Sequence, residues 1–311
     1  MKQILCTLIL ALWAFSLSAQ SSGEKGYGFL SLPVSAHAAA LGGENISLID
    51  DDINLALHNP ALLSSVSDRT ISFGYMSYMD GINALHAAYA KVLNDRATWG
   101  IGVDYLNYGT LSRRDELDTD LGTFSAKDMN FMGLFAYNLT DYWSGGVTAK
   151  AIYCSYDSYS SFALAVDLGL NYYNAAKDFS GSVCVKNLGG ELKAFDQNYT
   201  KLPLDLQAGI SKKLSDAPVS YHITASQLQD WSDSFMKHFN FGVDIYPSKS
   251  LYIAAGYSCR RASDLKVGES SHGAGWSFGA GLHVRRIKVD ASYGVYHVSG
   301  GSLLLNFAYT L

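Results

Sequence analysis

The sequence predicts an all-β fold: a transmembrane antiparallel β-barrel of about fourteen strands, with a short helical N-terminal hatch in its lumen. Three observations predict it. Apolar residues alternate with small or polar ones along most of the chain, the connections between alternating segments sort into a short and a long set, and the N-terminus has the layout of a secretory leader. The chain therefore divides into a signal peptide (residues 1–19), a hatch or plug (residues 20–68) and an outer-membrane barrel (residues 69–311).

The leader is predicted from a charge, an apolar core and small residues in that order. Lys2 precedes an apolar run over residues 4–17, and Ser18 and Ala19 follow it. After the leader there is no apolar run of 18 residues, so no membrane-spanning helix is expected. A chain with 13% aromatic and 16% charged residues and scattered apolar positions is either a soluble all-β domain or a transmembrane barrel.

The alternation has a period of two, which is typical of a β-strand with one apolar face. Phe162, Leu164 and Val166 share one parity, while Asp167 lies among small and polar residues of the other. We therefore expect Val166 to face lipid, where arginine is costly, and Asp167 to face the lumen, where asparagine is tolerated. Fourteen such segments are expected, with approximate cores at residues 70–79, 82–92, 97–108, 123–138, 142–155, 159–172, 178–187, 203–213, 217–227, 238–246, 250–260, 273–284, 287–297 and 302–311.

The connections between these segments give a second argument. The four long ones, at residues 109–122, 188–202, 228–237 and 261–272, all follow odd-numbered segments and therefore lie at one end of the barrel. Outer-membrane barrels alternate tight periplasmic turns with longer outside loops, so this sorting predicts the outer membrane of a Gram-negative cell. A soluble periplasmic barrel is the alternative, but its outward face would carry far more Lys and Glu.

The segment before the barrel has helix signals instead of alternation. Leu41 precedes Gly42 and Gly43, and glycines at that place supply the positive φ that ends a short helix. Further on, Asn59 is a predicted N-cap, with Pro60 at the first helical position and Ala61 behind it. Short helices of small and apolar residues, placed before a barrel, are suited to fill its lumen.

Three consecutive carboxylates, Asp50, Asp51 and Asp52, could be calcium ligands. The Asp-x-Asp-x-Asp-Gly spacing of a calcium loop is missing, and adjacent carboxylates point in different directions. We therefore expect them to cap helices or to meet lumen cations such as Lys150 and Lys288.

Other chemistry has little support in the sequence. There is no Gly-x-Ser-x-Gly elbow and no His-Glu-x-x-His motif, so neither a catalytic centre nor a cofactor is expected. A net charge of -5 argues against a nucleic-acid surface. Three cysteines follow the leader, and we expect Cys154 and Cys184 to be free thiols facing the lumen, with Cys259 also unpaired or bonded externally.

Several stretches resemble a known family. "LPVSAHAAALGG" at 32–43, "DDDINLALHNPALL" at 50–63 and above all "LQAGISKKLSDAP" at 206–218 resemble the PorQ family of the type IX secretion system. The resemblance to PorV proteins and to FadL-type transporters is more distant. It implies a fourteen-stranded, non-catalytic outer-membrane barrel in an attachment complex with a PorZ-like surface protein, PorU and PorV. That complex processes cargo and couples it to anionic lipopolysaccharide.

If this implication holds, the outside loops carry the function and the lumen does not. The alternative is a FadL-like channel for hydrophobic small molecules, which the Gly, Ala, Ser, Asn and Asp of the lumen parity disfavour. The candidate docking residues are Arg113, Arg114, Asp115, Glu116, Asp118, Glu191, Lys193, Asp196, Arg260 and Arg261.

Overall fold

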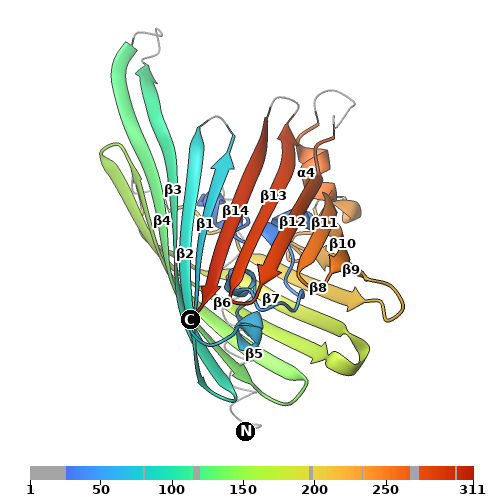
Figure 1. Cartoon of the computed structure of the whole chain (residues 1–311). Coiled ribbons are helices and arrows are strands. Elements are labelled where there is room, and N and C mark those ends of the chain that lie inside the picture. The colour runs from blue at the N-terminus through green and yellow to red at the C-terminus, as the bar shows by residue number, and fades with distance from the viewer. Residues whose placement is uncertain are drawn as a thin grey trace.

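The chain forms a closed antiparallel barrel in which every strand pairs with its sequence neighbours and β14 returns to β1 (Figure 1). The computed structural model describes residues 26–79, 81–114, 120–195, 199–232, 234–266, 273–297 and 300–311, so the predicted leader lies outside the described residues. The fourteen strands are β1 (Thr70–Tyr78), β2 (Ile82–Asn94), β3 (Ala97–Arg114), β4 (Asp120–Asn138), β5 (Trp143–Tyr156), β6 (Tyr159–Asn174), β7 (Phe179–Lys193), β8 (Asp205–Lys213), β9 (Val219–Ala225), β10 (Phe239–Ser248), β11 (Leu251–Ser258), β12 (Trp276–Val284), β13 (Ile287–His297) and β14 (Gly300–Thr310). The predicted fold class is confirmed.

The largest differences from the predicted segments lie at the end of the barrel that carries the long connections. β3 continues to Arg114 and β4 starts at Asp120, so most of the predicted loop at 109–122 is a paired hairpin that projects beyond its neighbours (Figure 1). β7 likewise continues to Lys193, inside the predicted loop at 188–202. The prediction ended these strands where apolar alternation ended, but backbone hydrogen bonds extend a hairpin beyond the apolar band.

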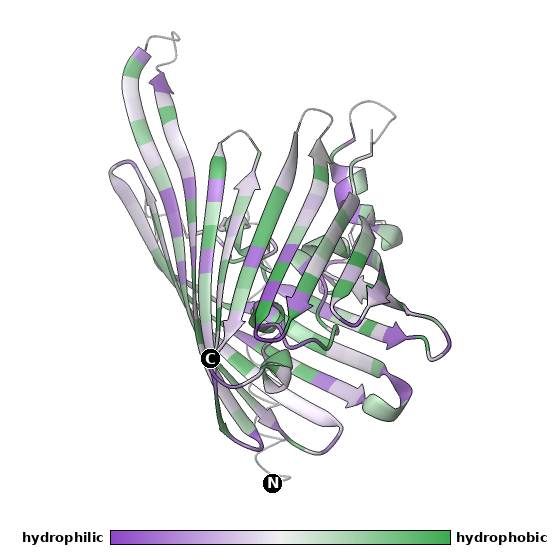
Figure 2. Ribbon diagram, viewed as in Figure 1, coloured by the Kyte–Doolittle hydropathy of each residue, from purple (hydrophilic) through white to green (hydrophobic). Residues whose placement is uncertain are grey.

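The two faces of the barrel wall differ as predicted. Phe73 and Phe307 pair across β1 and β14 and are 55% and 44% exposed, whereas Asp167 and Asp244 are fully buried toward the lumen. Figure 2 shows the resulting bands of hydrophobic and hydrophilic residues along the strands. Apolar side chains therefore cover the outside of the barrel, the reverse of a soluble barrel.

The segment before β1 occupies the lumen as four short helices (Figure 1). Its first α-helix packs against β11 to β14, and its last helix packs against β3 to β6, so the hatch reaches opposite sides of the wall. The helices are η1 (Gly28–Ser31), α2 (Ala36–Ala40), α3 (Ile53–Ala56) and η2 (Pro60–Ser65), while η3 (Ala175–Lys177), η4 (Phe235–His238) and α4 (Cys259–Asp264) lie in strand connections. Within the described ranges, every helix is too short or too polar to cross a membrane.

Candidate functional site

The first α-helix of the hatch fits against glycines of the wall. Gly42 and Gly43 end α2 with φ of 108° and 104°, as predicted from their position. The turn brings Leu41 against Gly242 and Gly256, and a Cβ added to Gly256 would lie only 2.2 Å from the Leu41 carbonyl carbon. These lumen-facing glycines therefore make the room that the hatch occupies.

The Asn59-Pro60-Ala61 step fits the opposite side in the same way. The Asn59 side chain accepts a hydrogen bond from the Ala61 N–H at 3.0 Å and caps η2, a 3-10 helix with Pro60 at its start. A Cβ on Gly169 would lie 2.0 Å from Asn59 Oδ1, and one on Gly146 would lie 2.3 Å from Pro60. Both ends of the hatch are therefore matched to glycines of the strands that face them.

The three aspartates have structural partners. Asp52 Oδ1 accepts a hydrogen bond from the Asn54 N–H at 2.9 Å and caps α3. Asp50 lies 3.5 Å from Lys288 Nζ, and Asp51 lies 3.7 Å from the same nitrogen. The expected contact with Lys288 is thus confirmed. The described residues contain no group of three His, Cys, Asp or Glu side chains that could hold a metal ion.

The expected contact between these aspartates and Lys150 is wrong. Lys150 Nζ lies 2.6 Å from Asp167 Oδ2 on the adjacent strand, and both side chains are buried. The Lys150 ammonium also donates a hydrogen bond to Asn187 Oδ1 at 2.9 Å. Parity placed Lys150 on the lumen face correctly, but β5–β6 register supplied a partner closer than the hatch.

Another carboxylate of the hatch, Glu44, was not identified from the sequence and joins the hatch to β7 and β8. Glu44 Oε2 lies 3.4 Å from Lys186 Nζ, 3.3 Å from Gln207 Nε2 and 3.5 Å from His58 Nδ1. Burial raises the pKa of Glu44, but Lys186 and His58 outweigh it and lower the pKa to about 2. The sequence did hold one indication of this contact. Lys186 lies on the lumen-facing parity of its strand, where a buried ammonium group requires a carboxylate partner.

A buried histidine makes the corresponding link to β10. His37 Nε2 lies 3.0 Å from Asp244 Oδ2, and His222 Nε2 lies 3.1 Å from the same oxygen. The other ring nitrogen of His222, Nδ1, is hydrogen-bonded to the Ser211 hydroxyl. That hydroxyl lies 2.8 Å from the Ser47 hydroxyl of the hatch. Hydrogen bonds thus run from hatch to wall and back to the hatch.

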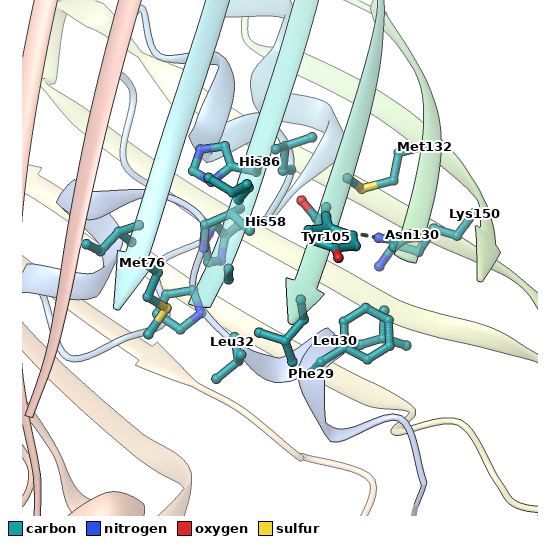
Figure 3. A pocket seen from close by; sticks show the side chains of 18 of the residues that line it. Phe29, Leu30, Leu32, His58, Met76, His86, Tyr105, Asn130, Met132 and Lys150 are labelled. Carbon is teal, nitrogen blue, oxygen red and sulfur yellow. Dashed lines mark hydrogen bonds between the residues drawn. The ribbon is translucent and has the colours of Figure 1, made fainter. Parts of the chain in front are cut away.

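Two of the spaces among the described residues lie beside the hatch. One is a cavity of about 50 Å³ lined by apolar hatch residues such as Phe29 and Leu32 and by polar residues such as His86, Asn130 and Lys150 (Figure 3). The other, about 760 Å³, opens at the end of the barrel with the short turns and is lined by Lys212, Lys249, Asp50 and other polar residues.

Those of the predicted docking residues that the structure describes lie at the outer rim, the end formed by the connections that follow odd-numbered strands. Arg113 forms an exposed ion pair with Asp157, and Arg114 is the last residue of β3. Both arginines therefore lie on the projecting hairpin. The predicted docking residues Asp115, Glu116, Asp118 and Asp196 lie outside the described residues.

Glu191 and Lys193, at the end of β7, have internal contacts. Glu191 accepts hydrogen bonds from the Tyr27 hydroxyl at 2.5 Å and from the Thr200 N–H at 2.8 Å. It therefore joins the start of the hatch to the rim, which the sequence did not indicate. Lys193 is exposed and donates a hydrogen bond to the Ser160 hydroxyl at 2.6 Å.

Arg260 was expected at the end of a strand and Arg261 in the loop at 261–272, but both lie in helix α4. The helix starts there because the Ser258 hydroxyl caps it by accepting a hydrogen bond from the Arg261 N–H at 3.3 Å. The Arg261 guanidinium donates hydrogen bonds to the Gly275 carbonyl at 2.9 Å and to Ser277 Oγ at 2.7 Å. Arg261 thus holds α4 to the rim.

The three cysteines of the described residues are free thiols. Cys154 and Cys184 are buried, and Cys259 is partly exposed. The Cys184 thiol lies 3.8 Å from the His58 carbonyl oxygen of the hatch.

No protein-family model and no curated protein matches the sequence. Solved structures with a similar fold include the toluene transporter TbuX of Ralstonia pickettii (13% identity, TM-score 0.59, covering 90% of this chain and 98% of that one). The CymD monoaromatic hydrocarbon channel gives 13% identity and a TM-score of 0.62, with 90% and 98% coverage. The toluene transporter TodX of Pseudomonas putida is 14% identical with a TM-score of 0.57, and the match covers 93% of this chain and 98% of TodX. The fold is therefore that of the FadL-like outer-membrane barrels, and the PorQ resemblance stays a prediction.

Proposed function

We propose that this protein is a non-catalytic outer-membrane barrel, closed by its hatch, whose outer rim holds a surface protein at the membrane. In the terms of the PorQ resemblance, the partner is a PorZ-like protein in an attachment complex with PorU and PorV. The enzymatic steps, including the coupling of cargo to anionic lipopolysaccharide, then belong to the partners. The observation that carries the proposal is the fastening of the hatch inside the lumen.

The hatch is attached around most of the wall by buried polar contacts. Each hydrogen bond contributes about 0.5–1.5 kcal/mol, so movement of the hatch as one body would break many of them together. The contacts join Asn54 to Ser72 and His86, Ala61 to Ser144, Glu44 to Lys186, Ser47 to Ser211, His37 to Asp244, Asp50 to Lys288, and Val34 and Ala36 to Asn306.

The size of the smaller cavity beside the hatch supports a closed lumen. Its volume is about 50 Å³. An apolar cavity that binds benzene measures about 150 Å³, so a single aromatic ring would not fit in this cavity.

The projecting β3–β4 hairpin is the best candidate for the docking surface. Thr110 pairs with Ser125, and beyond this pair the hairpin carries Arg113 and Arg114 on exposed strand ends. A charged hairpin outside the apolar band is free to meet a partner in water.

The test shortens this hairpin without disturbing the wall. A two-residue Asn-Gly turn replaces residues 111–124 and joins Thr110 to Ser125, which are already cross-strand partners. Surface retention of the PorZ-like protein should be lost, whereas replacement of Lys249 by serine at the opposite end should leave it unchanged. Normal retention on a correctly inserted shortened barrel would contradict the proposal.

A second candidate function is uptake of hydrophobic small molecules. The structural neighbours favour it, because TbuX and TodX are toluene transporters and CymD is a monoaromatic hydrocarbon channel. Such uptake requires the hatch to move. Ser47 and Ser211 hydroxyls lie 2.8 Å apart, so a Ser47→Cys, Ser211→Cys pair in a background without the native cysteines should lock the hatch to β8. Toluene uptake that disappears on oxidation of this pair would establish the channel, and absence of uptake before oxidation would support closure.

A further inference from the structure

One side of the barrel wall is too short to span the apolar part of a membrane. β9 has seven residues and β11 has eight, whereas β4 has 19 and β6 has 16 (Figure 1). The lipid-facing band of an outer-membrane barrel is about 25 Å tall. Seven residues at about 3.4 Å each, tilted by about 45°, cover only about 17 Å of that height.

A column of aromatic rings continues upward from this short side. Phe241 faces outward on β10, beside Tyr257 on β11. From Phe241 the ring centroids of Phe239, Phe235 and Trp231 follow at 6.2, 5.0 and 6.0 Å, and this brings the column into the β9–β10 connection. The outward apolar face therefore continues past the end of the strands.

The end of this column is exposed. Trp231 is 56% exposed, Phe235 is 60% and Met236 is 51%, and we call these three side chains the apolar lip. Exposed side chains of this size at one place mark a contact with lipid or with another protein.

The lip is held in place by a buried histidine. His238 is fully buried, and its Nδ1 lies 2.9 Å from the Ser226 carbonyl oxygen across the connection. The Trp231 ring packs on His238 at 4.6 Å between centroids. Because His238 points inward, its neighbour Phe239 points outward, and Phe235 packs on Phe239 from the same side.

We propose that the apolar lip is immersed in the outer leaflet and completes the lipid-facing band where β9 and β11, the two neighbours of β10, are short. The occupant of this surface is lipid, since the lip is continuous with the outward face of β10 and the missing height of about 8 Å is of the size that a one-turn connection can supply. The rim has two regions on this assignment: the β3–β4 hairpin lies in water and the lip lies in the membrane.

Tryptophan fluorescence in brominated-lipid vesicles tests the depth of the lip. In the barrel without its leader, Trp99, Trp143 and Trp276 are replaced by phenylalanine, which leaves Trp231 as the only probe. A second variant keeps only Trp276, which faces outward from the wall. A third carries Leu121→Trp as its only tryptophan, on the exposed hairpin.

The outcomes separate lipid from the other possible contacts. Brominated lipid should quench Trp231 as strongly as Trp276, and should leave the Leu121→Trp probe unquenched. The proposal is overturned if Trp231 escapes quenching by lipid, whether because water reaches it, as shown by acrylamide quenching, or because another protein surface covers it. All three variants replace exposed aromatic or aliphatic side chains, so a folded barrel is checked first by its heat-dependent gel mobility.

Discussion

Replacing Asp167 with asparagine tests whether the buried charges of the lumen are balanced in pairs. Asp167 Oδ2 lies 2.6 Å from Lys150 Nζ, with side-chain exposures of 0% and 4%. Asp167 Oδ1 accepts a hydrogen bond from the Asn187 N–H at 2.7 Å. Asparagine retains that acceptor and the shape of the side chain, but an amide NH₂ takes the place of the oxygen that faces Lys150, so the substitution removes the charge and the acceptor at Lys150. The sequence alone indicated a mild effect, but the ion pair changes this expectation.

The magnitude follows from the charge left behind. Removing one partner of a buried ion pair costs about 3–5 kcal/mol, because the other charge stays buried without compensation. Lys150 keeps its hydrogen bond to Asn187 at 2.9 Å, which solvates part of the ammonium. We therefore expect Asp167→Asn to lower the free energy of unfolding by about 3 kcal/mol, the lower end of that range.

The assay is urea unfolding of the barrel from lipid vesicles, with a matched variant. Asp104→Asn makes the same chemical change on the same lumen face, where Asp104 accepts a hydrogen bond from Asn130 at 3.0 Å and belongs to no ion pair among the described residues. It should be neutral or stabilising. Adding Lys150→Met to Asp167→Asn should recover most of the loss. A loss below about 1 kcal/mol for Asp167→Asn, or equal losses for both asparagine variants, would refute the reasoning.

Three further predictions concern the wall and the hatch. In the same unfolding assay, Val166→Arg should cost about 2–4 kcal/mol near the membrane midplane, and a loss no greater than that of Val166→Ala would contradict its lipid-facing position. Gly256→Ala should expose the hatch to proteases, because the new Cβ would lie 2.2 Å from Leu41, whereas Gly133→Ala, with no atom within 4 Å, should not; equal cleavage rates would argue against close packing. The pKa of Glu44 is lowered from 4.5 to about 2, so its stabilisation is present above about pH 4.5 and is lost as the pH falls toward 2. Pepsin should therefore cleave the hatch increasingly over this range, and Glu44→Gln should flatten the profile.

The candidate docking surface changed between sequence and structure for a local reason. Charge and low hydrophobicity marked residues 109–122 as a loop, yet a hairpin outside the membrane needs no apolar face to stay paired. Glu191 and Arg261 were predicted to contact a partner protein. Instead, Glu191 accepts a hydrogen bond from Thr200 and Arg261 donates one to Gly275, both within this chain. Arg113 and Arg114 remain on an exposed surface. Sequence can thus locate a charged connection but not its internal partners.

The sequence by itself determined the wall. Period-two alternation is a property of each strand alone, so it fixed the outward face, the number of strands and the sorting of connections before any contact was known. The caps of the hatch are equally local, since Asn59 and Ala61 are two residues apart.

Only the tertiary structure decided how the hatch and the wall fit together. Glu44 and Lys186 are 142 residues apart, and Leu41 meets Gly256 only because closure of the barrel brings β11 around the hatch. No periodicity along the chain encodes which lumen cation meets which carboxylate. Lys150 was expected to meet the hatch aspartates, but it pairs with Asp167, and Asp50 pairs with Lys288. Partners so far apart in sequence are set by strand register and by the space that glycines leave, and both exist only once the ring of strands has closed.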